Sequence, residues 1–127
     1  MNIITHQEID QKLCGNPITI EPDFSCIELK TDKSMMVDKQ GLVHGGFIFG
    51  LADYAAMLAV NDPNVVLGSA DVKFLMPVKV GEIVVAEANT TSKKGKKYIV
   101  TVVVHRKDEA VFSGEFTCFV LDKHVLL

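Results

Sequence analysis

One carboxylate stands alone in a long apolar stretch of the sequence. Between Gly45 and Asn61 the only charged side chain is that of Asp53. Burying an unpaired carboxylate costs free energy and raises its pKa, so a carboxylate kept in such a place is a candidate general base or nucleophile. The alternative is a structural role, either at an exposed helix position or in a hydrogen bond to neighbouring backbone. The residue types alone leave both open.

The second candidate is the turn His44-Gly45-Gly46, which leads into the same apolar stretch. Glycine lets a substrate approach the backbone closely because it has no Cβ. The first N–H groups of a helix lack intrahelical partners and lie at the positive end of its dipole, so they can stabilise an oxyanion. The glycines could also serve only a tight turn. Combined with Asp53, two helical turns further along, they form a candidate site.

A helix must position these residues, and the sequence predicts one over residues 46–61. The segment is apolar nearly all round, and Asp62-Pro63-Asn64 ends it because proline cannot continue the hydrogen-bond ladder. A helix that is apolar on every side must be covered on every side. A curved sheet supplies part of that cover, and a partner subunit is expected to supply the rest. We therefore expect at least a dimer.

The segments around this helix are rich in β-branched and aromatic residues and predict strands, over residues 26–37, 65–75, 82–91, 97–107 and 110–121. Short polar turns join the last three, which favours an antiparallel meander. Residues 1–22 come first. Within them the capping-box spacing of Thr5 and Glu8 predicts a short amphipathic helix, followed by an extended lead-in. The pattern predicts a single α+β domain over residues 1–127.

The composition narrows the classes of function. The formal net charge is −3, which argues against a general nucleic-acid binder. Three scattered cysteines, Cys14, Cys26 and Cys118, indicate free thiols in a reducing compartment. The first residues lack the pattern of a signal peptide, and a central aspartate disfavours a membrane helix, so we expect a cytoplasmic protein. The other histidines are isolated, which predicts no metal site.

Residues 44–55, HGGFIFGLADYA, resemble the signature of PaaI-type hotdog thioesterases. Residues 38–43, DKQGLV, and residues 71–82, DVKFLMPVKVGE, resemble the flanking blocks of that family. The resemblance covers about residues 38–121, roughly two thirds of the chain. The His-Gly-Gly turn alone is a weak signal. The aspartate at the matching place and the Phe-Leu-x-Pro…Gly-Glu block make the combination specific.

This resemblance implies a hotdog fold, in which a curved antiparallel sheet of about five strands wraps a long central helix. It implies homodimers, often paired into tetramers, with the active site at the dimer interface. There the N–H of Gly45 or Gly46 would polarise the thioester carbonyl. Asp53 of the facing subunit would activate water or attack the carbonyl itself. The substrate would be an acyl-CoA, with no metal and no cofactor beyond the CoA of the substrate.

Two positions depart from the family pattern. Asp38 stands where many relatives carry Asn or Gln, and an ionised carboxylate only accepts hydrogen bonds. It could position the lytic water, raise the pKa of Asp53 by repulsion, or be a solvated loop residue. Met57 stands one turn beyond Asp53, where some relatives place a hydroxyl that holds the water. Gln40 is the candidate to replace that hydroxyl.

Other side chains could contact the substrate. The lysines around Gly95, Lys93, Lys94, Lys96 and Lys97, could meet CoA phosphates as point charges, or could form a solvated hairpin tip. An apolar or aromatic acyl pocket is suggested by Phe47, Phe49, Tyr54 and Met57, although core packing explains the same residues.

Two further functions compete with hydrolysis. A non-catalytic acyl-CoA-binding or sensing module could use the same groove. Regulators of that kind usually carry an added DNA-binding segment, and residues 1–15 are too short for a helix-turn-helix. A hotdog dehydratase would need a histidine placed as a base, whereas His44 lies in the thioesterase-like turn. We therefore expect an acyl-CoA thioesterase, with the binding module as the alternative.

Overall fold

The fold is one curved sheet around one long helix. A computed structural model describes residues 1–127. The elements in chain order are α1 (Gln11–Cys14), β1 (Asn16–Glu21), β2 (Phe24–Lys30), the 3-10 turn η1 (Lys33–Met35), α2 (Gly45–Val60), β3 (Val65–Phe74), β4 (Ile83–Lys94), β5 (Lys97–Arg106) and β6 (Glu109–Val120). The strands form one antiparallel sheet in the order β1-β2-β4-β5-β6-β3. The predicted α+β class and the hotdog fold are confirmed.

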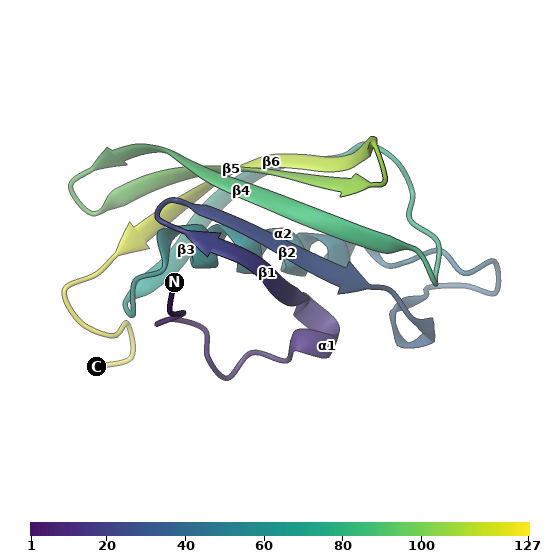
Figure 1. The fold of residues 1–127 in the computed structure, drawn as a ribbon, viewed down its shortest axis with the longest axis horizontal. Helices are drawn as coiled ribbons and strands as arrows, with labels where there is room; N and C mark the ends of the chain where they lie inside the picture. The colour runs from purple at the N-terminus through teal and green to yellow at the C-terminus, as the bar shows by residue number, and fades with distance from the viewer.

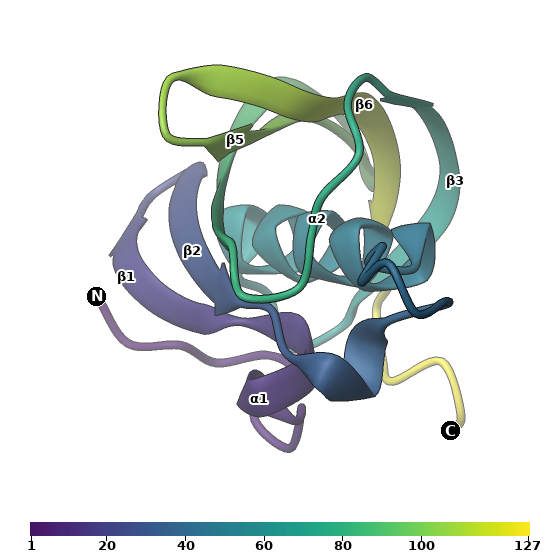
Figure 2. The same cartoon turned by 90° about the vertical axis from the view of Figure 1, so that its right-hand side faces the viewer.

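The sheet curls around α2, which lies in its concave face (Figures 1 and 2). In Figure 2, β1 and β2 cover one flank of α2, β5 lies above it, and β6 and β3 cover the other flank. The chain before β1, which includes α1, passes along the remaining side. Asn61 ties this segment to the end of α2, because its side chain accepts from the N–H of Ile4 and donates to the carbonyl of Asn2.

Small side chains let the centre of the sheet approach α2 closely. Ser25, Ala88, Val102 and Gly114 form one row across β2, β4, β5 and β6, and Val102 is the only large side chain in it. The buried hydroxyl of Ser25 donates to the carbonyl oxygen of Ala55 on α2 at 2.6 Å. A Cβ atom on Gly114 would lie 2.7 Å from a methyl group of Val72 on the neighbouring strand β3, so glycine is required there by packing within the sheet. The hydrogen bond from Ser25 thus helps to fix the distance between α2 and the sheet.

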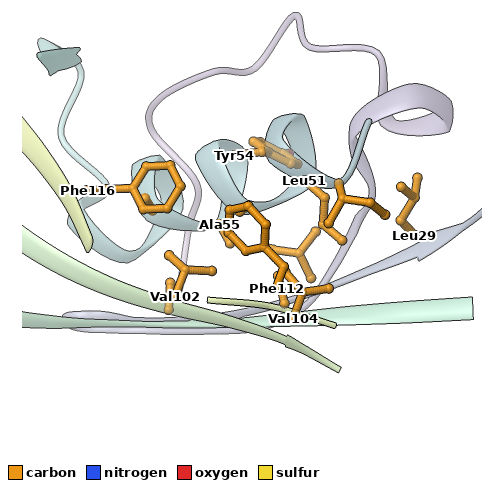
Figure 3. Close-up of a cluster of buried hydrophobic side chains, with 14 of the residues drawn as sticks. Leu29, Leu51, Tyr54, Ala55, Val102, Val104, Phe112 and Phe116 are labelled. Atoms are coloured by element: carbon orange, nitrogen blue, oxygen red, sulfur yellow. The ribbon is translucent and has the colours of Figure 1, made fainter. Parts of the chain in front are cut away.

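Large apolar side chains fill the space on both sides of this row. Figure 3 shows Leu51 and Ala55 of α2 beside side chains of the sheet, among them Leu29, Val104, Phe112 and Phe116, whereas Tyr54 lies on the side of α2 away from the strands. All of these residues belong to one buried cluster. The helix that carries Asp53 is therefore held rigidly along most of its length.

Four sequence-based expectations were wrong in detail. The lead-in before β2 forms a sixth strand, β1, at the edge of the sheet. The predicted capping box does not form, because the short helix starts later and its cap is the side chain of Asp10, which accepts from Lys12 N. The strand predicted over residues 26–37 ends at Lys30, because Asp32 caps the 3-10 turn that follows. The central helix begins at Gly45 and ends at Val60, one residue earlier at each end than expected.

Candidate functional site

Helix α2 begins with two N–H groups that have no acceptor. His44 is the N-cap, with extended backbone and no side-chain cap hydrogen bond. Its own N–H donates to Met35 O at 2.8 Å, and its carbonyl accepts from Phe47 N at 3.0 Å. The N–H groups of Gly45 and Gly46 donate to no protein atom. Gly45 is half-buried and Gly46 is exposed, so both N–H groups can donate hydrogen bonds to a ligand at the positive end of the helix.

Close neighbours limit the side chains that positions 45 and 46 can hold. A Cβ atom on Gly45 would lie 3.0 Å from the ring of Phe74 at the end of β3. A Cβ atom on Gly46 would lie 3.1 Å from the imidazole of His44. The imidazole is exposed and can move aside, whereas the Phe74 ring also packs edge-on against Phe112. A side chain at Gly45 therefore disturbs packing more than one at Gly46.

Asp53 lies on the face of α2 that points away from the sheet. Ala55, which bonds to the sheet through Ser25, is about 200° away around the helix axis. Gly46, Gly50 and Asp53 follow the spacing of a single helix face, and a Cβ atom on Gly50 would meet nothing within 4 Å. The open space beside Gly50 leaves this face accessible between the first turn and the carboxylate.

The carboxyl group of Asp53 is poorly solvated and unpaired. Its Oδ1 is buried and has no hydrogen-bond partner. Burial raises the pKa of Asp53 from its ordinary 3.8 to about 6. Desolvation is the only cause, because no cation or donor offsets it. A carboxylate with a pKa near neutrality suits the role of general base, since it is ionised at pH 7 yet still basic.

One subunit does not bring Asp53 and the amides of the first turn together. The seven residues from Gly46 to Asp53 correspond to about 10 Å along the helix axis. A general base must lie within hydrogen-bond reach of the water that it activates, directly or through one bridging water. The two candidate groups of a single chain therefore cannot act on the same carbonyl.

An apolar groove of about 310 Å³ opens beside the first turn of α2. Its floor is buried and its rim is exposed; the floor consists of Val43, Ile48, Val78 and Val111, and the rim of Leu42, Phe74, Leu75 and Met76. Gly45 and Pro77 complete the lining, which contains no charged side chain. The backbone of Gly45 thus joins the unpaired amides to an apolar cavity. The one signal of this groove in the sequence is the Phe-Leu-Met-Pro run on its rim, which is unusually apolar for a segment at the end of a strand.

Backbone and side-chain bonds hold the two walls of the groove. Val43 N donates to Val78 O at 2.8 Å, which ties the segment before α2 to the segment after β3. The guanidinium of Arg106 donates to Pro77 O at 2.6 Å and pairs with Glu82 at 3.0 Å. Glu82 in turn accepts from Lys79 N at 2.7 Å. The segment that follows β3 and forms one wall of the groove is therefore held in place by hydrogen bonds and an ion pair.

The other predicted substrate contacts lie elsewhere in the chain. Asp38 is an exposed loop residue whose Oδ1 accepts from Leu42 N at 3.2 Å, and it contributes nothing to the raised pKa of Asp53 in the same chain. Gln40 is exposed in the same loop. Met57 and Tyr54 are buried in the core, and Phe49 packs against Phe116. Core packing accounts for these three side chains.

The lysines lie at the far end of the sheet, at the tip of the β4–β5 hairpin (Figure 1). Lys93 pairs with Asp23 at 2.8 Å and lies over the ring of Tyr98, and Lys96 pairs with Asp122 at 2.8 Å. Lys94 is exposed and forms no ion pair within 4 Å. Within one subunit, this tip and the first turn of α2 lie at opposite ends of the fold.

The cysteines are free, as predicted. Cys118 is buried, and burial raises the pKa of its thiol to about 12, so it is not a nucleophile at neutral pH. No group of three or more His, Cys, Asp and Glu side chains is placed to hold a metal ion. None of the helices has the length and apolar character needed to cross a membrane.

Comparison with known proteins gives one family and several related structures. The model of the thioesterase superfamily matches residues 40–113. The crystal structure of the uncharacterized protein PH1136 from Pyrococcus horikoshii has a TM-score of 0.99 and 54% identity, over 100% of this chain and 98% of that chain. A structure of the phenylacetic acid degradation protein PaaI from Thermus thermophilus has a TM-score of 0.79 and 25% identity, over 86% of this chain and 95% of that chain.

Curated relatives match the chain over only part of their own length. Methylthioribose-1-phosphate isomerase of Aquifex aeolicus is 51% identical over 123 residues, which is 96% of this chain and 27% of that protein. Transcription factor FapR of Thermoanaerobacter sp. is 34% identical over 94 residues, which is 74% of this chain and 47% of that protein. The chain therefore spans about a quarter and about half of the length of these two relatives.

Proposed function

This chain belongs to the thioesterase superfamily, and from that premise we propose that it hydrolyses the thioester bond of an acyl-CoA or a related acyl thioester. One observation carries the proposal: the Oδ1 atom of Asp53 is buried without a hydrogen-bond partner, and the pKa of the carboxyl group is raised to about 6. Keeping such a group lowers the stability of the fold at neutral pH, so it needs a function to explain it. The unpaired amides of Gly45 and Gly46 supply the complementary half of a hydrolytic site.

We infer that the complete site forms between two subunits. β3 is an edge strand, and all but one of its residues from Gly68 to Phe74 are exposed. An unpaired edge is a template for pairing with another chain. Pairing of two β3 edges about a two-fold axis would set the two α2 helices side by side. The first turn of one helix could then face the partner subunit's Asp53, which the single chain cannot achieve.

The reaction follows from the two halves of this site. A water oxygen forms a bond to the thioester carbon while one water proton passes to the partner subunit's Asp53. The carbonyl electron pair moves onto oxygen, where the N–H groups of Gly45 and Gly46 stabilise the charge. Collapse of this intermediate breaks the C–S bond, and the CoA thiolate takes the proton from Asp53. The products are a carboxylic acid and CoA. Direct attack by Asp53 is the alternative route and uses the same residues.

The test is hydrolysis of a series of acyl-CoAs, from short to long and aryl, with detection of the free thiol. We expect turnover by the unmodified protein, with kcat/KM rising through one ionisation near pH 6. Asp53→Asn preserves the shape of the side chain but removes its basicity, and should lower kcat by about a hundredfold or more. Nearly full activity of Asp53→Asn would show that the carboxylate has a structural role.

A non-catalytic acyl-CoA-binding module is the second candidate, and the similarity to transcription factor FapR favours it. A regulator needs to bind its ligand but not to hydrolyse it. In that case the unmodified protein would bind acyl-CoA without releasing thiol, and Asp53→Asn would bind equally well. Equilibrium binding measured beside the hydrolysis series separates the two candidates.

A further inference from the structure

The apolar groove beside Gly45 adjoins the place where the proposed function puts the thioester carbonyl. Gly45 contributes both an unpaired N–H and part of the groove wall. A carbonyl bound at this amide would direct one of its two substituents into the groove. That substituent is either the acyl chain or the pantetheine arm of CoA.

The lining distinguishes these two substituents. It offers aliphatic and aromatic side chains, one glycine and one proline, and no polar side chain. The pantetheine arm carries two amide groups, and burying an amide without hydrogen bonds is unfavourable. A hydrocarbon chain has no such requirement. The groove therefore fits the acyl side of the substrate.

The surroundings also argue against a charged acyl group. A terminal carboxylate would need a cation in or beside the groove. Arg106 is close, because it bonds to Pro77 of the lining, but its guanidinium is already engaged by Glu82 and Glu109 and its side chain is only 18% exposed. The charge of Arg106 is thus neutralised before a substrate arrives. Lys79 follows Val78 of the lining and is exposed, but its side chain packs beside Gly41 and is not part of the lining.

We propose that this groove is the acyl subsite and that it selects an uncharged hydrocarbon acyl group of short to medium length over a dicarboxylic acyl group. This inference rests on the proposed acyl-thioester function and names its substrate class. The volume of about 310 Å³ lies at the lower end of the range for ligand pockets, which favours chains of modest length.

The test compares octanoyl-CoA, succinyl-CoA and free CoA. Binding is measured by titration calorimetry on Asp53→Asn, which is designed to leave the ligands intact, and kcat/KM is measured on the unmodified protein. We expect octanoyl-CoA to be preferred over succinyl-CoA by on the order of tenfold or more. Met76→Lys places a cation on the rim and should shift this ratio several-fold toward succinyl-CoA.

Ile83→Lys is the matched control. Ile83 is 47% exposed and Met76 is 43% exposed, but Ile83 lies outside the groove. Its substitution should leave the ratio unchanged. Equal affinity of the unmodified site for both ligands, or equal ratios in the two lysine variants, overturns the inference. A preserved preference without any hydrolysis supports the inference and instead refutes the proposed thioesterase activity.

Discussion

At the scale of single residues, the carboxyl group of Asp53 is ionised at neutral pH although its surroundings solvate it poorly. The folded pKa of about 6 lies above the ordinary 3.8, so the folded protein holds the proton more tightly than the unfolded chain. Stability therefore falls as the pH rises from about 3.8 to about 6. Above that window the ionised carboxylate reduces stability by about 3 kcal/mol, at 1.36 kcal/mol per pKa unit.

Asp53→Asn should relieve this penalty. We expect the variant to be more stable than the unmodified protein at pH 7 by up to about 3 kcal/mol, because asparagine does not ionise. The difference should shrink as the pH falls below 6 and nearly vanish near pH 3.8. Urea denaturation of both proteins, at one protein concentration and several pH values, measures it. A difference that does not depend on pH would mean that the carboxyl group is solvated in the assembled protein.

The first turn of α2 permits a clean test of the oxyanion donor. Gly46→Pro removes the N–H at a position where proline is tolerated, because that N–H has no intrahelical acceptor. Gly46→Ala adds a similar Cβ beside His44 but keeps the N–H. If Gly46 is the donor, Gly46→Pro should lower kcat by about a hundredfold or more, and Gly46→Ala should retain most of it. Equal losses in the two variants would indicate a steric effect, and equal retention would leave Gly45 as the donor.

At the scale of elements, the sequence predicted those parts whose signal is local. The central helix was evident because its 16 residues are almost entirely apolar and a proline follows shortly after it. β1 was missed because it is a short edge strand with a mixed burial pattern and contains Pro17. The start of the first helix was misplaced because Thr5 and Asp10 are both good caps, and only Asp10 is followed by helical backbone.

The candidate site likewise has parts that the sequence predicts and parts that it does not. Asp53 and the glycine turn were visible because their residue types are unusual for their positions. The groove was not, since it forms where Val43 and Val111, distant in sequence, meet in space. The lysine tip was correctly placed at a hairpin turn, but its distance from the first turn of α2 depends on the sheet order, which local patterns do not determine.

The contact between β2 and α2 offers a prediction at this scale. Ser25→Ala removes the buried hydrogen bond to Ala55 O and should lower the free energy of unfolding by about 1 kcal/mol. Ser113→Ala is the control, because Ser113 is half-buried and its hydroxyl makes no hydrogen bond to protein. Its effect should stay within about 0.5 kcal/mol. Chemical denaturation of both variants decides whether the hydroxyl helps to seat the helix.

At the scale of the whole molecule, the two sheet edges differ in a way that favours one mode of assembly. β1 is short and contains Pro17, which has no N–H to donate, and both features discourage further pairing. β3 has ten residues, and all but one of those from Gly68 to Phe74 are exposed. We therefore expect assembly through β3. A stable monomer of 13.9 kDa in sedimentation at micromolar concentration would exclude the shared site.

Mixing two inactive variants tests the shared site directly. Asp53→Asn and Gly46→Pro each disable both sites of their own homodimer. A mixed dimer would contain one site with an intact Gly46 from one subunit and an intact Asp53 from the other. After subunit exchange in equal amounts, we expect about a quarter of the normal activity, since half of the dimers are mixed and each has one working site. If each site uses residues of one chain only, mixing would restore nothing.

The order of the strands also has a consequence for the growing chain on the ribosome. β3 pairs only with β6, and β4 and β5 lie between them in sequence. Until the last strand has been synthesised, β3 has no partner within the chain, and α2 lacks the cover of Phe112 and Phe116. The nascent chain thus exposes the apolar surface of α2 and the unpaired backbone of β3 together during the synthesis of about 50 residues. Binding by a chaperone in this period would protect the chain from aggregation.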